Sequence, residues 1–593
     1  MTTVSYGKRG ELIKELDSPR FLLADQGNYF SLPTLKRSRY DGFFVFNETM
    51  YRVIDSIGTG ESPERVEVHP NLINAISRSN AITYHLSESS LILQAKNKES
   101  FTISLDCRQS YDTRKFGKNY KILFYHGLVL VTFEKQSDER EDTSGGEKEF
   151  TLFIAIKHDG SFIKTDKWRE VAYQTDVERN SPPADWWVYD AVRINAKKIV
   201  VTAGFHRDLV VKEAEEKFSK PVNEADVTDE AALTFARGNL HALIANNSLL
   251  AGLPWFFQNW SRDTMISLKG LAMMGETGMV KNILEKSVMQ LTEEGRLKNI
   301  NNKGYETAEA SADGVLWFTL RMDECLKLFT RKEKLIISKI LEHNFARLWK
   351  AHSKDELMTN GHKQTWMDTD WEDEGRAGAR IEIQALTLRY LALLCRLTKK
   401  TVYADEEKLM RKRVKDVFFR EGKLWDGPSD PTQRPNIFLA YYAYPKLLAK
   451  KEWEIVFDAA LGELWLDWGG LATISRHHPH YSSMHTGENN QSYHRGDSWY
   501  FVNNIAAMAM NSVNPRKYRE KIRKIMEAST KDILWLGVCG TASELSSASQ
   551  QTGQGCWSQA WSLATYLELA KNRKDIQEAT NLYAHLPPIS PGL

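Results

Sequence analysis

Up to about residue 205, hydrophobic and polar positions follow the pattern of β-strands. Runs rich in β-branched and aromatic residues are separated by turn residues, as in FTISLDC, YKILFYHGLVLVTFEK, EFTLFIAIKHDG and AKKIVVTAG. A polar insert, QSDEREDTSGGEKE, interrupts them between residues 136 and 149. The pattern predicts a β-rich N-terminal domain over residues 1–205, a β-sandwich in its simplest form.

Beyond residue 205 the apolar spacing becomes that of α-helices and stays so to the end of the chain. The charged stretch 206–227 is predicted to be a linker between the two parts. Apolar side chains then recur at helical spacing, for example at Leu386, Tyr390 and Leu393. Twelve helices are predicted within residues 228–593, near 228–246, 262–276, 279–293, 309–329, 332–350, 380–398, 403–418, 434–447, 450–463, 497–512, 515–531 and 556–571.

The links between these helices alternate between short and long. Links after the second, fourth, sixth, eighth and tenth helices span a few residues, whereas the others are mostly longer and rich in polar and aromatic residues. In a ring of helix pairs, alternate links emerge at the same end, so six long links would surround one mouth. The predicted fold is therefore multidomain β + α, an N-terminal β-sandwich followed by an (α/α)6 barrel. The long links contain SLLAGLPWFFQNWS, NINNKGYETAEAS, HKQTWMDTDWEDEGRAGAR, LWDGPSDPTQRP, HHPHYSSMHTGENNQSYHRG and GVCGTASELSSASQQTGQG.

Composition narrows the class of ligand. With 593 residues, the chain is longer than one compact core usually organises. A net charge of +2, from 79 Lys and Arg against 77 Asp and Glu, gives no bulk electrostatic reason to bind nucleic acid or an anionic membrane. Neither partner is expected. The 17 tryptophans and 22 tyrosines indicate sugar binding instead, because a pyranose offers a C–H face to a ring and hydroxyls to polar neighbours.

Export, cofactor and metal signals are weak. No apolar stretch reaches the roughly 18 residues of a membrane span, so a cytoplasmic location is expected. The five cysteines show no CxxC spacing and are interpreted as inert thiols in a reducing compartment. One link gathers several histidines without carboxylates at ligand spacing, so neither a metal nor a cofactor is predicted. These histidines are His477, His478, His480 and His485.

The segment PWFFQNWSRDTMISLKGL (254–271) raises the first functional question. Aromatic rings surround the charged pair Arg262 and Asp263 at the start of a predicted helix. Rings that only filled a core would not need polar residues between them, so the mixture indicates a polar ligand with apolar faces. Two interpretations of the pair stay open, hydroxyl binding and, for Asp263, a charge at the helix N-terminus.

Five segments, in this order, resemble the amylo-α-1,6-glucosidase domain of glycogen debranching enzymes and, more distantly, glucoamylases. They are FLLADQGNYFSLPTLKRSRYDGFFV, WSRDTMISLKGL, TWMDT followed by IEIQALTLRYLALL, YHRGDSWYFVNN and GCWSQAWSLATYLE. Any one segment is weak evidence, but five in the family's order, spread over most of the chain, are strong. The sequence departs from the family pattern at Tyr500, where many relatives have proline, and at Asp41, where the N-terminal motif has histidine.

The resemblance implies an inverting glycoside hydrolase with two catalytic carboxyl groups. Inversion needs one carboxylic acid that protonates the leaving oxygen and one carboxylate that activates water, about 6.5 to 9.5 Å apart. Asp368 is the candidate acid, because apolar neighbours such as Trp366 would raise its pKa. Glu544, the only carboxylate between residues 533 and 566, is the candidate base. An ordinary solvated loop carboxylate is the alternative at either position.

For substrate binding, the resemblance assigns Arg262 and Asp263 to the outer hydroxyls of the terminal glucose. For Asp313, the alternative interpretation is a helix cap. Glu382 is expected to orient other side chains. For Phe256 and Phe257, the alternative is packing in the core. The remaining binding candidates are Trp255, Trp260, Asp313, Trp317, Trp366, Glu382, Tyr493 and His494.

Three classes of function are compared. An inverting, exo-acting glycoside hydrolase would release glucose from α-1,6-linked stubs of glycogen or related α-glucan oligosaccharides, with glucoamylase-like α-1,4 cleavage as the runner-up. A glycoside phosphorylase would need a phosphate site, but residues 533–570 contain no Lys, Arg or His. A non-catalytic glycan-binding protein would not need both Asp368 and Glu544. Hydrolysis is therefore favoured, and the oligomeric state is not predicted.

Overall fold

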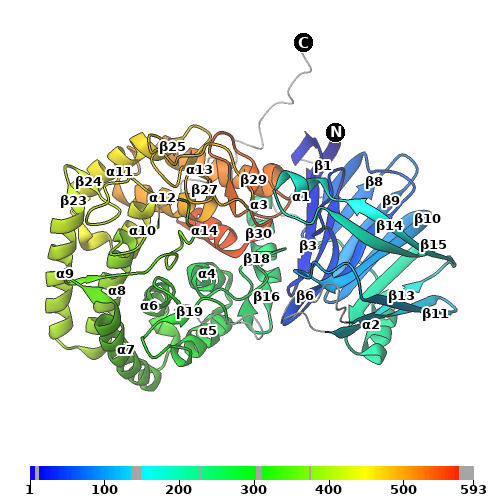
Figure 1. Ribbon diagram of the computed structural model, residues 1–593, viewed down its shortest axis with the longest axis horizontal. Coiled ribbons are helices and arrows are strands. Elements are labelled where there is room, and N and C mark those ends of the chain that lie inside the picture. The colour runs from blue at the N-terminus through cyan, green and yellow to red at the C-terminus, as the bar shows by residue number, and fades with distance from the viewer. Residues whose placement is uncertain (7–11, 137–148, 226–229, 302–309, 373–374, 573–593) are drawn as a thin grey trace, which may run out of the picture.

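A β-domain and a ring of α-helices lie side by side in the computed structural model (Figure 1). The structure describes residues 1–6, 12–136, 149–225, 230–301, 310–372 and 375–572. Most of the polar insert predicted at 136–149 lies outside the described residues. Within these ranges, no helix has the length and apolar character that crossing a membrane requires.

Fifteen strands of the β-domain hydrogen-bond into one branched, mostly antiparallel sheet. The exception to the antiparallel pairing is the parallel pair of β1 and β7. The strands are β1 (Thr2–Tyr6), β2 (Leu12–Leu16), β3 (Arg20–Asp25), β4 (Asn28–Pro33), β5 (Gly42–Asn47), β6 (Thr49–Gly58), β7 (Arg65–Val68), β8 (Leu72–Ile76), β9 (Ala81–Ser87), β10 (Ser90–Gln109), β11 (Lys118–Tyr125), β12 (Leu128–Lys135), β13 (Phe150–His158), β14 (Ser161–Ala172) and β15 (Asp185–Gly204).

The long strands β10 and β15 are shared by the two layers of a sandwich. They pair with each other, and the register shifts between Gln94 and Glu99 of β10, as at a β-bulge. Before the shift β10 pairs with β9, and after it with β6. One branch of the sheet therefore continues through β9, β8 and β7, and the other through β6, β5, β4 and β3. Strand β3 contacts β8 and β9 without pairing to them, as expected of facing layers.

The stretch predicted as a linker, 206–227, contains a helix that packs on the β-domain. Helix α2 (Arg207–Ser219) follows β15 and buries Val210 and Ala214 against Leu130 and Ala155 of the sheet. Only these two residues of the helix are buried, and charged residues surround them in the sequence. The stretch therefore had the pattern of a linker. A shorter helix, α1 (Gln174–Glu178), connects β14 to β15. The domain boundaries themselves stay a prediction.

Twelve α-helices follow residue 230 in the described part of the chain, as the apolar pattern predicts. Alternate helices contact one another in a closed inner ring, α4-α6-α8-α10-α12-α14, and α14 returns to α4. The inner helices are buried on nearly all sides, whereas outer ones such as α13 bury a single stripe. The predicted (α/α)6 barrel is confirmed. Its helices are α3 (Ala231–Ala242), α4 (Ser261–Met274), α5 (Thr277–Met289), α6 (Gly314–Glu324), α7 (Arg331–His352), α8 (Ile381–Thr398), α9 (Val402–Phe418), α10 (Asn436–Ala443), α11 (Lys450–Leu464), α12 (Tyr500–Val513), α13 (Arg519–Lys531) and α14 (Ala560–Lys571).

Every long link ends at the N-terminus of an inner helix, so all six links meet at one end of the ring. Short strand pairs brace these links, a feature that the sequence pattern does not predict. The short strands are β16 (Ile244–Ala245), β17 (Ser248–Leu249), β18 (Gly252–Leu253), β19 (Leu297–Lys298), β20 (Ala310–Ser311), β21 (Ser353–Lys354), β22 (Leu357–Met358), β23 (Phe419–Arg420), β24 (Lys423–Leu424), β25 (Trp465–Leu466), β26 (Gly470–Leu471), β27 (Ser498–Trp499), β28 (Leu545–Ser546), β29 (Gly553–Gln554) and β30 (Ser558–Gln559).

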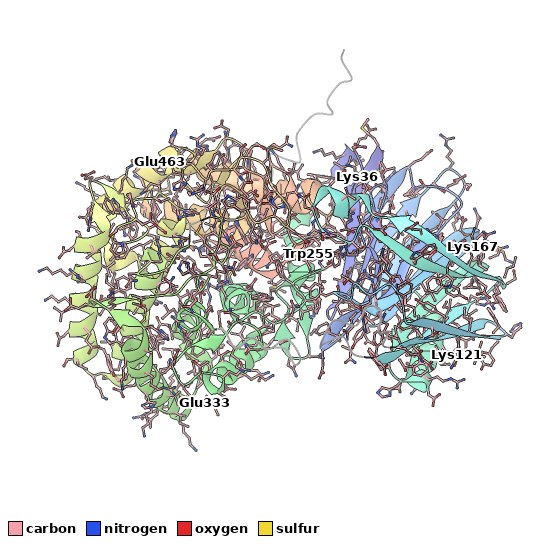
Figure 2. The ribbon with its side chains drawn as sticks, viewed as in Figure 1. Lys36, Lys121, Lys167, Trp255, Glu333 and Glu463 are labelled. Carbon is pink, nitrogen blue, oxygen red and sulfur yellow. The ribbon has the colours of Figure 1, made fainter. Side chains whose placement is uncertain are left out.

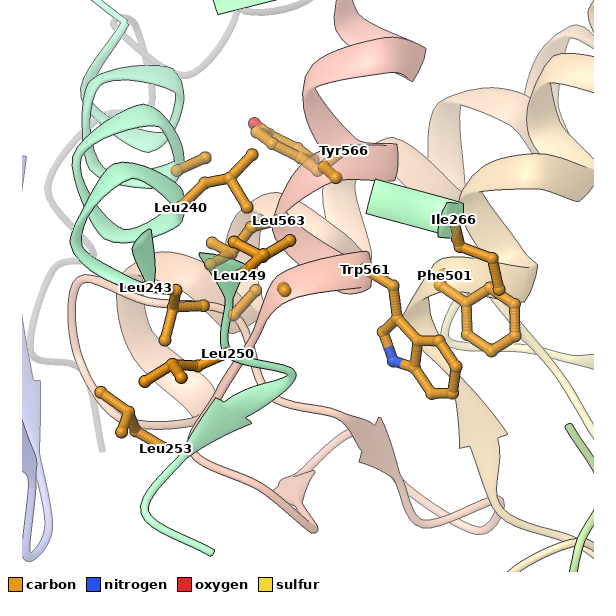
Figure 3. Close-up of a cluster of buried hydrophobic side chains, with 14 of the residues drawn as sticks. Leu240, Leu243, Leu249, Leu250, Leu253, Ile266, Phe501, Trp561, Leu563 and Tyr566 are labelled. Carbon is orange, nitrogen blue, oxygen red and sulfur yellow. The ribbon is translucent and has the colours of Figure 1, made fainter. Parts of the chain in front are cut away.

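The first and last inner helices pack closely, which brings the first and last long links together. Figure 3 shows the apolar side chains at this junction, including Phe501 of α12 and Trp561 of α14, whose rings stack 4.3 Å apart. Gly270 of α4 faces Ala564 of α14, and a Cβ at position 270 would lie 2.7 Å from the Cα of Ala564. The absence of a side chain at Gly270 therefore permits the close approach of these two helices.

Candidate active site

Arg262 joins three of the long links at the mouth of the barrel. It lies in the first turn of α4, and its Nε donates to both carboxylate oxygens of Asp313 at 2.9 and 2.8 Å. Its Nη1 donates to Oδ2 of Asp368 at 3.1 Å. Asp313 occupies the N-cap position of α6 but makes no capping hydrogen bond, since its carboxylate faces Arg262. Asp313 therefore has the position of a helix cap but does not act as one.

Asp368 is the accessible carboxyl group of this arrangement. Its side chain is 34% exposed, whereas that of Asp313 is 1% exposed. Burial of the carboxyl raises the pKa of Asp368, Arg262 opposes this shift, and the charge of Asp313 adds to it. The net direction is upward, which favours a proton on Asp368 at a higher pH than an ordinary aspartate keeps it.

Glu544 lies in the link before α14 and is 2% exposed. The Tyr493 hydroxyl donates to its Oε1 at 2.5 Å, and the Cys556 amide N–H donates to its Oε2 at 2.9 Å. Burial raises the pKa of Glu544 to about 7, although both hydrogen bonds favour the charged form. A carboxyl group with this pKa can take up or release a proton near neutrality.

Asp263 is held by a residue that the sequence analysis did not assign. Gln559 donates from Nε2 to Oδ1 of Asp263 at 3.0 Å, across the contact between α4 and the link before α14. Burial raises the pKa of Asp263 to about 8; Arg262 lowers it, and the charges of Glu544 and Asp368 raise it further. Gln559 lies in the quoted segment GCWSQAWS, where a polar residue among apolar ones was the available signal. Asp263 also stands in the first turn of α4, so its position suits either interpretation of the pair.

The tryptophan candidates fall into a half-buried pair and a buried pair. Trp255 and Trp260 are half-buried beside the fully buried Phe257. Trp366, the tryptophan of the TWMDT segment, is buried, and its Nε1 donates to Oδ1 of Asn436 at 2.7 Å. Trp317 is buried in the ring of inner helices. The two half-buried rings are partly open to solvent, and contact of all four tryptophans with substrate stays a prediction.

Glu382 and Arg376 form a buried ion pair beneath the TWMDT segment. Nη1 of Arg376 donates to Glu382 Oε1 at 2.8 Å and to the Thr365 hydroxyl at 2.9 Å. Its Nε donates to Asp426, which belongs to the next long link. Glu382 thus contacts side chains that hold the link of Asp368, as expected of an orienting residue. Arg376 and Asp426 were missed, because their spacing in the sequence gives no sign that they meet.

His494 supports the residue that follows Asp368. Its Nδ1 lies 2.8 Å from the Thr369 hydroxyl, and its ring stacks on Trp499 at 5.1 Å. Burial, followed by the charges of Arg495 and Arg434, lowers the pKa of His494 well below its usual value. The imidazole is therefore neutral at neutral pH and holds Thr369 in place as a hydrogen-bonding group.

The two departures from the family pattern have local explanations. Tyr500 is the first residue of α12, a position where proline is also tolerated. Asp41 accepts from Nε of Arg20 at 2.9 Å, and the Arg20 guanidinium lies 4.5 Å from the ring centroid of Trp557. The carboxylate at position 41 therefore holds a cation over an aromatic ring that follows Cys556.

The histidine-rich link forms ordinary polar contacts. Nδ1 of His485 lies 2.7 Å from Oδ2 of Asp497, and His480 lies 3.5 Å from Glu372. Among the described residues, no group of three or more His, Cys, Asp or Glu side chains could hold a metal ion. The five cysteines are free thiols, and burial raises the pKa of Cys539 to about 12.

Comparison with known families decides the identity of this barrel. The profile of the family described as Amylo-alpha-1,6-glucosidase matches residues 231–568, more than half of the chain. The chain belongs to the amylo-α-1,6-glucosidase family. It is a glycoside hydrolase, and its substrate is a carbohydrate. The resemblance found in the sequence is thereby confirmed.

Solved structures were compared for their fold. A bacterial glucoamylase complexed with acarbose has the same fold and matches with a TM-score of 0.57 at 11% identity, over 93% of this chain and 91% of that one. Neutral trehalase Nth1 from Saccharomyces cerevisiae matches with a TM-score of 0.44 at 14% identity, over 57% of this chain and 75% of that one. The mannosylglycerate hydrolase from Thermus thermophilus matches with a TM-score of 0.43 at 13% identity, over 58% of this chain and 100% of that one. No curated protein sequence matches the chain.

Proposed function

We propose that this glycoside hydrolase is an inverting, exo-acting amylo-α-1,6-glucosidase that releases glucose from α-1,6-linked stubs of glycogen-type glucans in the cytoplasm. One observation carries the proposal. Asp368 and Glu544 belong to two long links that end at the same mouth, and burial raises the pKa of both carboxyl groups. Two carboxyl groups with raised pKa values, of which that of Glu544 is about 7, suit acid–base cleavage of a glycosidic bond.

The proposed roles follow from the surroundings of each carboxyl group. Asp368 is the more exposed of the two, so it protonates the oxygen of the departing glucan, while Arg262 fixes its orientation. Glu544 lies deeper and accepts the hydroxyl hydrogen of Tyr493, so it takes the proton of the attacking water. Attack from the face opposite the leaving oxygen inverts the anomeric centre. Arg262 and Asp263 would bind the hydroxyls of the terminal glucose.

Linkage preference distinguishes the two leading candidates. The family match supports α-1,6 cleavage. The likeness in fold to a bacterial glucoamylase whose complex holds acarbose supports α-1,4 cleavage as the second candidate. Incubation with phosphorylase limit dextrin, isomaltose, panose and maltose in parallel, with glucose measured in each, separates them. We expect the limit dextrin to be the best substrate, and preference for maltose would favour the glucoamylase-like activity.

The stereochemical course tests the reaction type. Proton NMR during early turnover should show β-glucose first, and release of α-glucose would contradict inversion. A strict requirement for phosphate, with glucose 1-phosphate as product, would identify a phosphorylase. Glu544→Gln should abolish release of glucose, and rescue by azide as β-glucosyl azide would show that Glu544 activates the water.

A further inference from the structure

Residues of the β-domain hold the ring of Trp255 at the edge of the barrel. Figure 2 labels Trp255 where the barrel meets the β-domain. The guanidinium of Arg179 lies 3.8 Å from the centroid of this ring, and Tyr40 meets it edge-on at 5.3 Å. The hydroxyl of Tyr111 donates to the carbonyl oxygen of Trp255. Three side chains from one domain thus fix an aromatic residue of the other.

Trp255 also belongs to the surroundings of Glu544. Its ring meets that of Trp557 edge-on at 5.7 Å. Trp557 directly follows Cys556, whose amide N–H donates to Glu544 at 2.9 Å. Arg262 and Asp263 are buried at the start of α4, whereas Trp255 is half-buried at the rim. The ring is therefore placed for glucosyl units beyond the innermost one.

Arg179 also contacts the long link that carries Tyr493. Nη2 of Arg179 lies 3.4 Å from Oε1 of Glu488, and the amide N–H of Glu488 donates to the carbonyl oxygen of Arg179 at 3.0 Å. Between these contacts Gly487 has a φ of 65°, and a Cβ there would lie 2.2 Å from the Arg179 carbonyl oxygen. The amide N–H of Thr486 donates to the Ser492 hydroxyl at 2.9 Å, next to Tyr493.

We propose that Arg179 is a positioning residue. Through it, the β-domain shapes the part of the sugar site that binds the departing glucan. Arg179 touches neither catalytic carboxyl group, so it acts by holding Trp255 and the 486–488 segment in one arrangement. An aromatic ring fixed in this way offers a face to the C–H face of a glucosyl unit in the departing glucan. The inference rests on the proposed function and adds that recognition of long leaving groups depends on the β-domain.

The test compares a substrate with a large leaving group and one with almost none. In Arg179→Ala, kcat/KM on a branched limit dextrin should fall about five- to twentyfold, mainly through KM, because a stacked cation is lost. On α-glucosyl fluoride the same variant should change less than about twofold. Arg179→Lys keeps the charge without the planar guanidinium, so it should fall between wild type and Arg179→Ala. The control, Arg193→Ala, removes an exposed arginine of the same domain and should change neither substrate.

Three outcomes would overturn the inference. Equal losses on both substrates would mean that Arg179 supports the catalytic links as a whole, and no loss on either would mean that Trp255 stays in place without it. A wild-type enzyme that releases glucose from neither substrate would refute the proposed function, and the inference with it. If Arg179→Ala does not fold, Arg179→Lys and Glu488→Gln carry the same comparison of the two substrates.

Discussion

Two clusters of charged side chains, one in each part of the molecule, contain buried carboxyl groups whose pKa values are shifted in opposite directions: the pKa of Asp55 and Asp106 falls, whereas that of Asp263 and Glu544 rises. The β-domain cluster consists of Arg37, Arg52, Asp55, Asp106, Arg108 and Lys118. Asp106 accepts from Lys118 at 2.6 Å, from Arg52 at 2.7 Å and from Arg108 at 3.0 Å. Burial alone would raise its pKa, but the three cations lower it well below the usual range. By the same balance, Arg52 and Arg37 lower the pKa of Asp55 to about 2.

The mouth cluster consists of Arg262, Asp263, Asp313, Asp368 and Glu544. Arg262 is shared between Asp313 and Asp368. Within the described residues, neither Asp263 nor Glu544 forms an ion pair, and their pKa values rise to about 8 and about 7. Asp263, Glu544, Asp55 and Asp106 are all nearly inaccessible to solvent, so the number of cations decides the direction.

The difference is the one expected between a cluster that stabilises the fold and the proposed catalytic cluster. Carboxylates with several cations stay charged at every physiological pH and stabilise the β-domain through their hydrogen bonds. Asp263 and Glu544, which have no ion-pair partner among the described residues, have pKa values near neutrality, as acid–base chemistry needs, at a cost in stability. Buried carboxyl groups of the same types thus suit different purposes according to the cations beside them.

The largest expected effect is on turnover, in the mouth cluster. Asp368→Asn keeps the shape of the side chain but removes the transferable proton, so kcat should fall by about 10² to 10⁴ with little change in KM. Initial rates of glucose release from the limit dextrin measure this. Asp370→Asn is the matched control, since Asp370 pairs with Lys363 at 2.8 Å and should be dispensable. Near-normal turnover of Asp368→Asn would exclude Asp368 as the acid.

The next effect is on stability, in the β-domain cluster. Asp106→Asn leaves three buried cations short of a partner and should lower the free energy of unfolding by about 3–5 kcal/mol. The folded pKa of Asp106 lies below the unfolded value, so its contribution is present above about pH 4 and is lost as the pH falls further. Urea unfolding should show a large difference between wild type and variant at pH 7 and the first part of its loss, below about 1 kcal/mol, at pH 3.5, with kcat of the folded variant unchanged. An unchanged free energy of unfolding at pH 7 would show that Lys118, Arg52 and Arg108 do not need the negative charge of Asp106.

The opposite sign is expected for Glu544→Gln. The folded pKa of Glu544, about 7, lies above the unfolded value of about 4.3, so wild type loses stability as the pH rises between them. Glutamine does not titrate, and the inactive variant should be more stable than wild type by about 2–4 kcal/mol at pH 8 and equally stable at pH 4. Thermal unfolding at both pH values measures the gap. If the variant were less stable than wild type at pH 8, the hydrogen bonds to the Glu544 carboxylate would outweigh the cost of burying its charge.

The smallest effect is expected for an exposed ion pair, which serves as a reference for the two buried clusters. Arg78 and Glu64 form an ion pair at 2.6 Å with side chains that are 85% and 59% exposed. Water screens such a pair, so Arg78→Ala should change Tm by no more than about 1 °C. A shift comparable to that of Asp106→Asn would mean that burial does not govern these interactions.

Much of the fold could be predicted because it depends on local periodicity. Twelve stretches of helical spacing, joined alternately by short and long links, predict a ring of helix pairs, and inner helices such as α8 and α12 are indeed buried on nearly all sides. Helix α2 was missed as a packed helix because two small apolar residues, Val210 and Ala214, are its whole buried face. The strand pairs of the long links are two residues long, too short for a period to be visible.

The sequence by itself determined the two-part fold, the alternation of short and long links, and which links carry Arg262, Asp368 and Glu544. Only the tertiary structure decided that Arg262 bridges Asp313 and Asp368, that Gln559 holds Asp263, and that Arg179 covers Trp255 from the other domain. The physical reason is distance along the chain. Periodicity records what a residue does within its own helix or strand, whereas a pKa shift or a cation over a ring depends on groups brought together from positions far apart in the sequence.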